Sequence, residues 1–176
     1  MATAAQVARA LRDELSTDPG TVKLHKLLYY CQAWHATWTG EALFDEPIEA
    51  WENGPVVADL WRVEKHGFRV SMPDEPLSDE EARTVSYVVS RYGSKWASQL
   101  IGETHAERPW REAYARGRNT VIPIESMRAF FADDAGADQA GFWTKEWREG
   151  EVEAMHDARA GRTKVFYSTD EFLESL

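Results

Sequence analysis

Apolar side chains recur every three or four positions over two stretches near the start of the chain, as they do in helices with one buried face. Between residues 3 and 16 this spacing places Val7, Leu11 and Leu15 on the same side. An Asp-Pro-Gly sequence, which is typical of a helix end, follows. Residues 21–39 carry a wider apolar stripe and are followed by a glycine. The pattern therefore predicts two successive helices, over 3–16 and 21–39.

The next part of the chain predicts a short extended segment and then a third helix. Residues 48–53 read Ile-Glu-Ala-Trp-Glu-Asn, and the asparagine is followed by a glycine, which is typical of a turn. Pro55 comes next, and proline is tolerated in the first turn of a helix. The apolar positions that follow predict a helix from Pro55 to a stop at Gly67.

The following region predicts several shorter helices. Ser78 precedes three consecutive acidic residues, so its hydroxyl can cap a helix whose positive end the acids complement. This helix is expected over 79–92. Further helices are expected over 94–103, 110–115 and 124–131, with a turn around Pro109.

A change in composition after Phe131 divides the chain. Residues 133–140 are small, polar and acidic, which is typical of a linker. We therefore expect a compact, mainly α, multi-helix domain over residues 1–132, with a short β element near 48–53. A C-terminal extension over 141–176 should form a helix, a strand-like run and a last helical turn.

Length and composition fit one globular core. The chain has 176 residues, of which 43% are hydrophobic. Its 8 Trp, 6 Tyr and 7 Phe supply both large buried areas and anchors of the kind used at protein interfaces. No run approaches the roughly 20 apolar residues needed to span a bilayer, and the N-terminal residues lack a signal-peptide pattern. A cytoplasmic protein without membrane contact is expected.

The charge disfavours direct binding to nucleic acid. The formal net charge is -10, and residues 133–176 contribute -6 of it through 11 acidic and 5 basic side chains. Affinity for a phosphate backbone depends largely on Lys and Arg side chains that displace counterions. Binding to DNA or RNA is therefore an unfavoured hypothesis.

The sequence predicts no catalytic residue, metal or cofactor. The histidines are scattered at positions 25, 35, 66, 105 and 156, without a pair spaced to hold a metal. Serine-hydrolase and phosphate-binding glycine motifs are absent from the sequence. Cys31, the single cysteine, lies on the apolar stripe of the second helix, so we expect a buried thiol rather than a nucleophile.

One polar and aromatic cluster could carry chemistry. Thr104, His105, Pro109 and Trp110 lie close together in the sequence, at an expected helix end. A hydrogen-bonded corner of the structure is the favoured interpretation of this histidine. An enzyme that uses His105 is kept as an alternative.

The stretch KLHKLLYYCQAWHATWTGEALFDEPIEAWENGPVVADLW (Lys23 to Trp61) resembles the Panacea domain family, the SocA-like or GepA-like proteins of bacteria and their phages. Two later stretches, Thr104 to Tyr114 and Ile122 to Phe131, are similar to the family pattern as well. The residues that carry this resemblance are Lys23, Leu24, Lys26, Leu27, Tyr29, Tyr30, Gln32, Trp34, Gly40, Phe44, Trp51, Gly54, Pro55, Val56, Thr104, His105, Pro109 and Trp110.

The resemblance implies a mostly helical domain that acts as the antitoxin of a bacterial or phage toxin-antitoxin pair. Its partner would be a cognate protein toxin, encoded in the adjacent reading frame, and the protein would not be an enzyme. In one branch of the family the domain acts as an adaptor that delivers its toxin to a protease. This role, with a protease as a second partner, is the alternative.

The C-terminal extension is similar to toxin-binding tails of small antitoxins. It embeds apolar anchors in charge, which suits docking on another surface. These expected partner-binding residues are Trp143, Trp147, Val165, Phe166, Tyr167, Phe172 and Leu173, beside Phe142. Docking of the extension on its own domain is the alternative.

Overall fold

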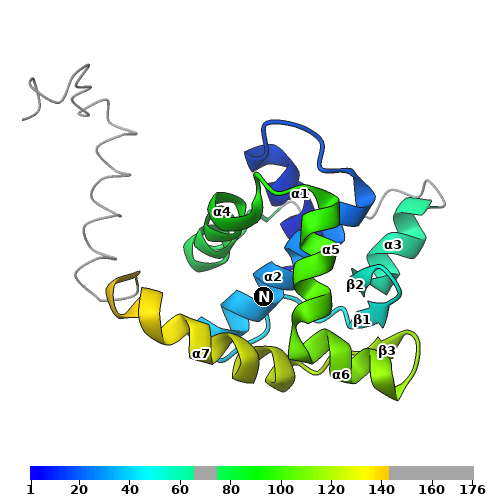
Figure 1. Ribbon diagram of the computed structural model, residues 1–176. Coiled ribbons are helices and arrows are strands. Elements are labelled where there is room, and N and C mark those ends of the chain that lie inside the picture. Colours follow the sequence, from blue (N-terminus) through cyan, green and yellow to red (C-terminus); the bar gives the residue numbers. More distant parts are fainter. Residues whose placement is uncertain (66–74, 143–176) are drawn as a thin grey trace, which may run out of the picture. The chain divides into compact units, whose positions relative to one another are not determined.

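The computed structural model describes residues 1–65 and 75–142, with side chains up to Asp133. The chain divides into two units, Met1–Asp134 and Ala135–Leu176. The fold described below is that of the first unit (Figure 1). Residues 143–176 carry all seven expected partner-binding residues and lie outside the described part of the chain.

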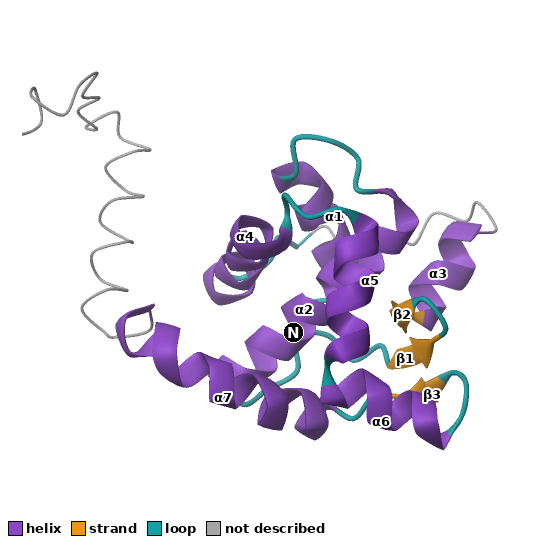
Figure 2. Cartoon of the chain, viewed as in Figure 1, coloured by secondary structure: helices purple, strands orange, loops and turns teal. Residues whose placement is uncertain are grey.

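The described residues form a mainly helical fold with one small sheet, as the sequence predicts (Figure 2). The helices are α1 (Ala4–Glu14), α2 (Gly20–Thr39), α3 (Ala58–Lys65), α4 (Asp79–Tyr92), α5 (Ala97–Ala106), α6 (Arg108–Arg116) and α7 (Ile124–Phe142). The strands are β1 (Ile48–Trp51), β2 (Gly54–Val57) and β3 (Thr120–Val121).

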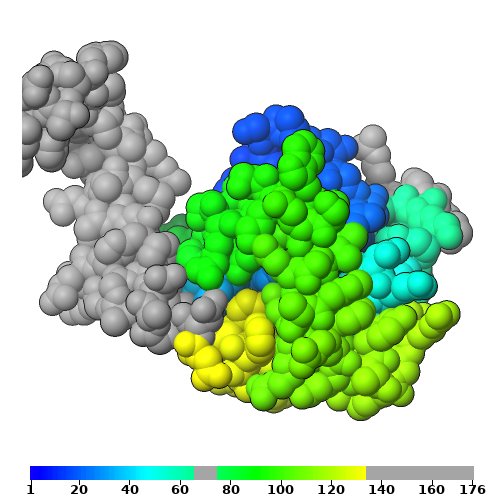
Figure 3. All heavy atoms as spheres, viewed as in Figure 1, coloured from blue at the N-terminus to red at the C-terminus, as the bar shows by residue number. Residues whose placement is uncertain are grey.

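Helix α2 is the centre of the fold. Every residue from Leu24 to Ala36 is buried, so this stretch is enclosed around its whole circumference. Helices α1, α4 and α5 and strand β2 pack against it. Phe131 of α7 joins them, with its ring centroid 5.0 Å from that of Trp34. The green helices α4 and α5 cover much of α2 on the face shown in Figure 3.

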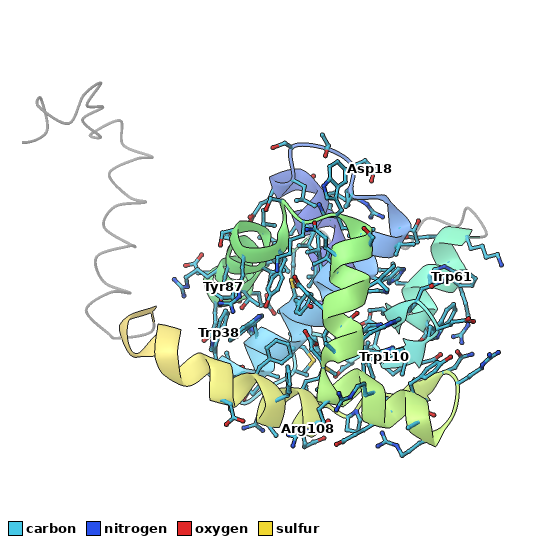
Figure 4. All side chains as sticks on the ribbon, viewed as in Figure 1. Asp18, Trp38, Trp61, Tyr87, Arg108 and Trp110 are labelled. Carbon is cyan, nitrogen blue, oxygen red and sulfur yellow. The ribbon has the colours of Figure 1, made fainter. Side chains whose placement is uncertain are left out.

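Two clusters of aromatic side chains lie on different sides of α2 (Figure 4). Trp38 of α2 packs edge-to-face on Tyr87 of α4, with 4.8 Å between ring centroids. Trp61 of α3 lies beside the sheet, where it packs edge-to-face on Trp51 at 4.9 Å. The first cluster extends the closed core, whereas the second borders the cavity described below.

The sheet corrects the prediction for residues 54–57. Its order is β2-β1-β3, and β1 pairs with both neighbours in antiparallel register. The expected extended segment forms β1, but Pro55 lies in β2, paired with Ala50, and α3 begins only at Ala58. Because β2 is an edge strand, a proline without an N–H is tolerated there. The short strand β3 was not predicted.

Other element ends follow the local sequence to different degrees. The Ser78 side chain accepts a hydrogen bond from the Glu81 amide, and the Ser78 amide donates one to the Glu81 carboxylate, so the predicted cap is confirmed. Helix α7, by contrast, runs to Phe142 rather than ending at Phe131. Alanine, the strongest helix former, is frequent in 132–140, which accounts for the longer helix. A domain boundary at 133–140 stays a prediction.

Candidate functional site

The residues that carry the family resemblance are mostly inside the fold. Leu24, Lys26, Leu27, Tyr29, Tyr30, Gln32, Trp34, Phe44, Gly54, Pro55, Val56, Thr104, Pro109 and Trp110 are buried. Lys23, Trp51 and His105 are half-buried, and only Gly40 among the set is exposed. Gly40 ends α2 in the left-handed conformation, with φ 82°, which suits glycine. Most residues that carry the resemblance therefore stabilise the fold, and few of them lie on its surface.

Two tyrosines of α2 share one carboxylate. The hydroxyls of Tyr29 and Tyr30 donate to the two carboxylate oxygens of Glu107 at 2.7 and 2.9 Å. Burial and the nearby Glu107 charge raise the pKa of both hydroxyls well above the usual value. Glu107 itself is 9% exposed. Glu107 lies within the stretch Thr104 to Tyr114, but no feature of the sequence distinguishes it from its neighbours.

Further buried polar groups of α2 are also paired. The amide of Gln32 donates to the Phe44 carbonyl at 2.9 Å and accepts from the Leu43 amide at 2.9 Å. The Trp34 indole donates to the Tyr92 hydroxyl at 3.1 Å. His35 Nδ1 lies 3.0 Å from the Thr84 hydroxyl. These contacts give the middle of α2 a structural role.

Lys26 places a buried amine next to the hairpin. Its ammonium donates to the Pro55 carbonyl at 2.9 Å, and burial lowers its pKa to about 7. Gly54 passes so close that an added Cβ would lie 2.6 Å from the Lys26 Cε and 2.9 Å from the Thr104 hydroxyl. Gly54 also has φ +94°, so glycine is required here for both space and backbone conformation.

His105 is part of an aromatic stack. Its ring lies on Trp110 with 4.0 Å between centroids, and Trp110 continues the stack onto Tyr114 at 4.8 Å. The Trp110 indole donates to the Trp51 carbonyl at 3.0 Å. Burial and the Lys26 charge lower the pKa of His105, while the hydrogen bond that its ring donates to the Glu52 backbone carbonyl acts in the opposite direction. The predicted hydrogen-bonded corner is thus a stack of aromatic rings on α5 and α6, which the Trp110 hydrogen bond links to the hairpin.

A cavity of about 440 Å³ lies between the start of α2, the β1–β2 hairpin and α3. Its polar lining includes His25, Lys26, Glu52, Asn53 and Arg118, and the indoles of Trp51 and Trp61 form an apolar part. Of the lining residues, those that carry the resemblance are Lys26, Trp51 and Val56. The others are contributed by separate elements, so no local sequence pattern groups them.

His25 is the unusual member of this lining. The residue is 1% exposed, yet neither ring nitrogen has a hydrogen-bond partner among the described residues. Burial lowers the pKa of His25 to about 4, with smaller contributions from the charges of Lys26 and Arg12. The ring is therefore neutral near pH 7 and presents one donor and one acceptor.

Comparison with known proteins gives one family. The family model "Antitoxin SocA-like, Panacea domain" matches residues 24–111, which is half of the chain. The chain belongs to this SocA-like antitoxin family. The match includes most of α2, the hairpin, α3, α4, α5 and the start of α6, and it contains seven of the eleven residues that line the cavity. No curated protein and no solved structure matches the chain.

The structure also locates the single cysteine and bears on metal sites and membrane spans. Cys31 is buried, as predicted, and burial raises the pKa of its thiol. Within residues 1–65 and 75–142, no group of three or more His, Cys, Asp or Glu side chains could hold a metal ion. In the same part of the chain, no helix is long and apolar enough to cross a membrane.

Proposed function

We propose that this chain is an antitoxin that binds and neutralises a cognate protein toxin encoded in the adjacent reading frame. The observation that carries the proposal is the family match over residues 24–111. The geometry supports a binding role, because the buried polar side chains in the middle of α2 are engaged within the fold. Neutralisation then acts through contact between two protein surfaces.

An exposed tryptophan provides a candidate anchor on the described domain. Trp96 lies in the turn between α4 and α5 and is 77% exposed, although tryptophan is the residue most enriched at the energetic centres of interfaces. The turn is held in place, since the Lys23 ammonium donates to the Gly93 carbonyl at 2.6 Å and Lys95 pairs with Glu103 at 2.6 Å. A turn whose backbone is held in this way loses little freedom on binding.

Charge supports fast association with a basic partner. The net charge of -10 would steer a toxin with a positively charged cleft toward this chain. The acidic, aromatic segment 141–176 is a second candidate contact. Raising the ionic strength from about 50 to 500 mM should then slow association by about tenfold or more. Association that is insensitive to salt would remove the steering argument and leave the contact itself.

The deciding experiment is co-expression with the product of the adjacent reading frame. We expect restored growth and a complex that co-purifies; no rescue together with no complex would overturn the proposal. Toxin lifetime is measured in the same cells. A shortened lifetime that depends on a host protease would assign the adaptor role instead of plain blocking.

Variants then locate the contact. Trp96→Ser removes the indole while placing a favourable cap at the start of α5, so folding should be retained. Val121→Ser, at a second exposed apolar position, is the matched control. We expect Trp96→Ser to weaken the complex by about tenfold or more and Val121→Ser to leave it unchanged. A truncation that removes residues 143–176 tests the contribution of the extension separately.

A further inference from the structure

The cavity between α2, the hairpin and α3 combines features that a closed structural core does not have. Its volume of about 440 Å³ lies within the range of small-molecule sites. Its lining joins indole rings with a few polar groups, the usual composition of such sites. The residues that line it do not include Trp96 or segment 141–176, the contacts proposed above for a toxin.

One end of the cavity suits an anion. Thr21 and Val22, in the first turn of α2, line it, and the first backbone N–H groups of a helix have no carbonyl partner within the helix. Pro19 provides no side-chain cap, and the first turn contains no acidic residue. Asp18, just before the helix, accepts a hydrogen bond from the Gly20 amide at 2.9 Å. The following amides of the first turn, at Thr21 and Val22, are therefore the donors that can face this space, as in sites that hold phosphate or carboxylate groups.

A second and independent observation points to a missing ligand. His25 lies one turn further along α2, is 99% buried and lines the cavity with both ring nitrogens unpaired among the described residues. Buried polar groups are almost always hydrogen-bonded, and leaving one unpaired is costly. Arg118 adds a cationic group to the same lining, and Lys26 adds an amine whose pKa is about 7. The site thus offers several donors to one anionic group.

The rest of the lining suits a planar ring that carries polar edges. Trp51 and Trp61 supply aromatic surface, on which a heterocycle can stack. Asn53, Asn119 and Glu52 supply amide and carboxylate groups that can bond to the edge of a base or to ribose hydroxyls. An acidic peptide would bind at the cationic end, but its acidic side chains would not require this combination of aromatic and amide groups.

We propose that this cavity binds a mononucleotide, with its phosphate at the start of α2 near His25, Lys26 and Arg118 and its base against Trp51 and Trp61. The overall negative charge of the chain disfavours a polynucleotide, whereas a single phosphate can be neutralised inside the cavity by these local groups. The proposal is independent of the toxin, since it concerns a small ligand of the free protein.

The proposal is tested by calorimetric titration of the purified full chain with 5′-AMP, adenosine and inorganic phosphate. We expect 5′-AMP to bind at least tenfold more tightly than either fragment, because base stacking and phosphate contacts act together. No binding of 5′-AMP, or equal affinity for 5′-AMP and phosphate, would overturn the proposal. Binding of a short acidic peptide in place of 5′-AMP would assign the cavity to a protein partner and would overturn it as well.

Variants distinguish this cavity from any other surface. Trp61→Ala should weaken 5′-AMP binding by about tenfold, since stacking against an aromatic side chain is lost. Arg118→Ala should weaken it as well, whereas Arg116→Ala, an exposed arginine outside the lining, should not. Val22→Asp places a carboxylate where the phosphate is expected and should abolish binding. Equal affinities for all four variants and the parent chain would place the nucleotide elsewhere.

Discussion

Two consecutive stretches of α2 differ in whether their buried polar side chains have hydrogen-bond partners. In the middle stretch the hydroxyls of Tyr29 and Tyr30 share Glu107, and the Trp34 indole bonds to Tyr92. In the first stretch His25 is equally buried but unpaired among the described residues, beside a cavity. The same helix thus contains a satisfied structural network and an unsatisfied site. Burial alone therefore does not show whether a polar side chain is paired within the fold; its hydrogen bonds do.

The largest expected effect comes from breaking the satisfied network. Glu107→Ala removes the shared acceptor and leaves two buried hydroxyls without it, so we expect the free energy of unfolding to fall by about 3 to 5 kcal/mol. Urea denaturation measures the change. Glu107→Gln keeps one carbonyl acceptor, so its free energy of unfolding should fall by clearly less than that of Glu107→Ala. Equal losses for both variants would show that the charge, rather than the pairing, stabilises this region.

The unpaired stretch should make the protein sensitive to acid. His25 has its pKa lowered from 6.5 to about 4 in the folded chain, so between these values the unfolded chain binds more protons. The stabilisation is present above pH 6.5 and is lost as the pH falls toward 4. The free energy of unfolding should decrease by about 3 kcal/mol over this window through His25.

Replacing the ring by a group that does not titrate tests this assignment. His25→Gln should remove most of the slope between pH 7 and 4 in denaturation curves recorded at several pH values. His35 and His105 also have lowered pKa values and contribute in the same direction, so a smaller slope should remain. An unchanged slope would exclude His25 as its main source.

A smaller effect is expected where the hairpin passes Lys26. Gly54→Ala places a Cβ against Lys26 and Thr104 at a position with positive φ, so we expect a loss of about 2 to 3 kcal/mol. Gly102→Ala is the matched control, because this helical glycine has open space around it and should gain about 0.5 to 1 kcal/mol. Thermal unfolding of both variants gives the contrast.

The smallest effect sharpens the view of the first turn of α2 as an anion site. Val22→Asp adds a negative charge beside the helix N-terminus and should stabilise the free chain by about 0.5 kcal/mol. Val22→Lys should destabilise it by a similar amount. The difference between the two variants should shrink in high salt, since the position is exposed. No difference at low salt would show that the dipole is already compensated.

Elements were predicted correctly where the residues that determine them lie close together in the sequence. The cap at Ser78 and the helices over most of α1, α2 and α4 were predictable, because their signals lie within one or two turns of the chain. Pro55 was assigned to a helix because proline suits a first helical turn. Pairing with Ala50 at a sheet edge placed it in β2 instead, and that pairing is not visible in local periodicity.

The sequence by itself determined the family, the mainly helical class and the burial of the α2 stripe, since repeated spacing and a long signature record them directly. Only the tertiary structure decided what the polar members of that stripe do. Glu107 reaches Tyr29 from 78 residues away, and the cavity lining comes from α2, the hairpin, α3 and the loop after α6. Hydrogen-bond pairing depends on distances across the fold, which a local pattern of residues does not contain.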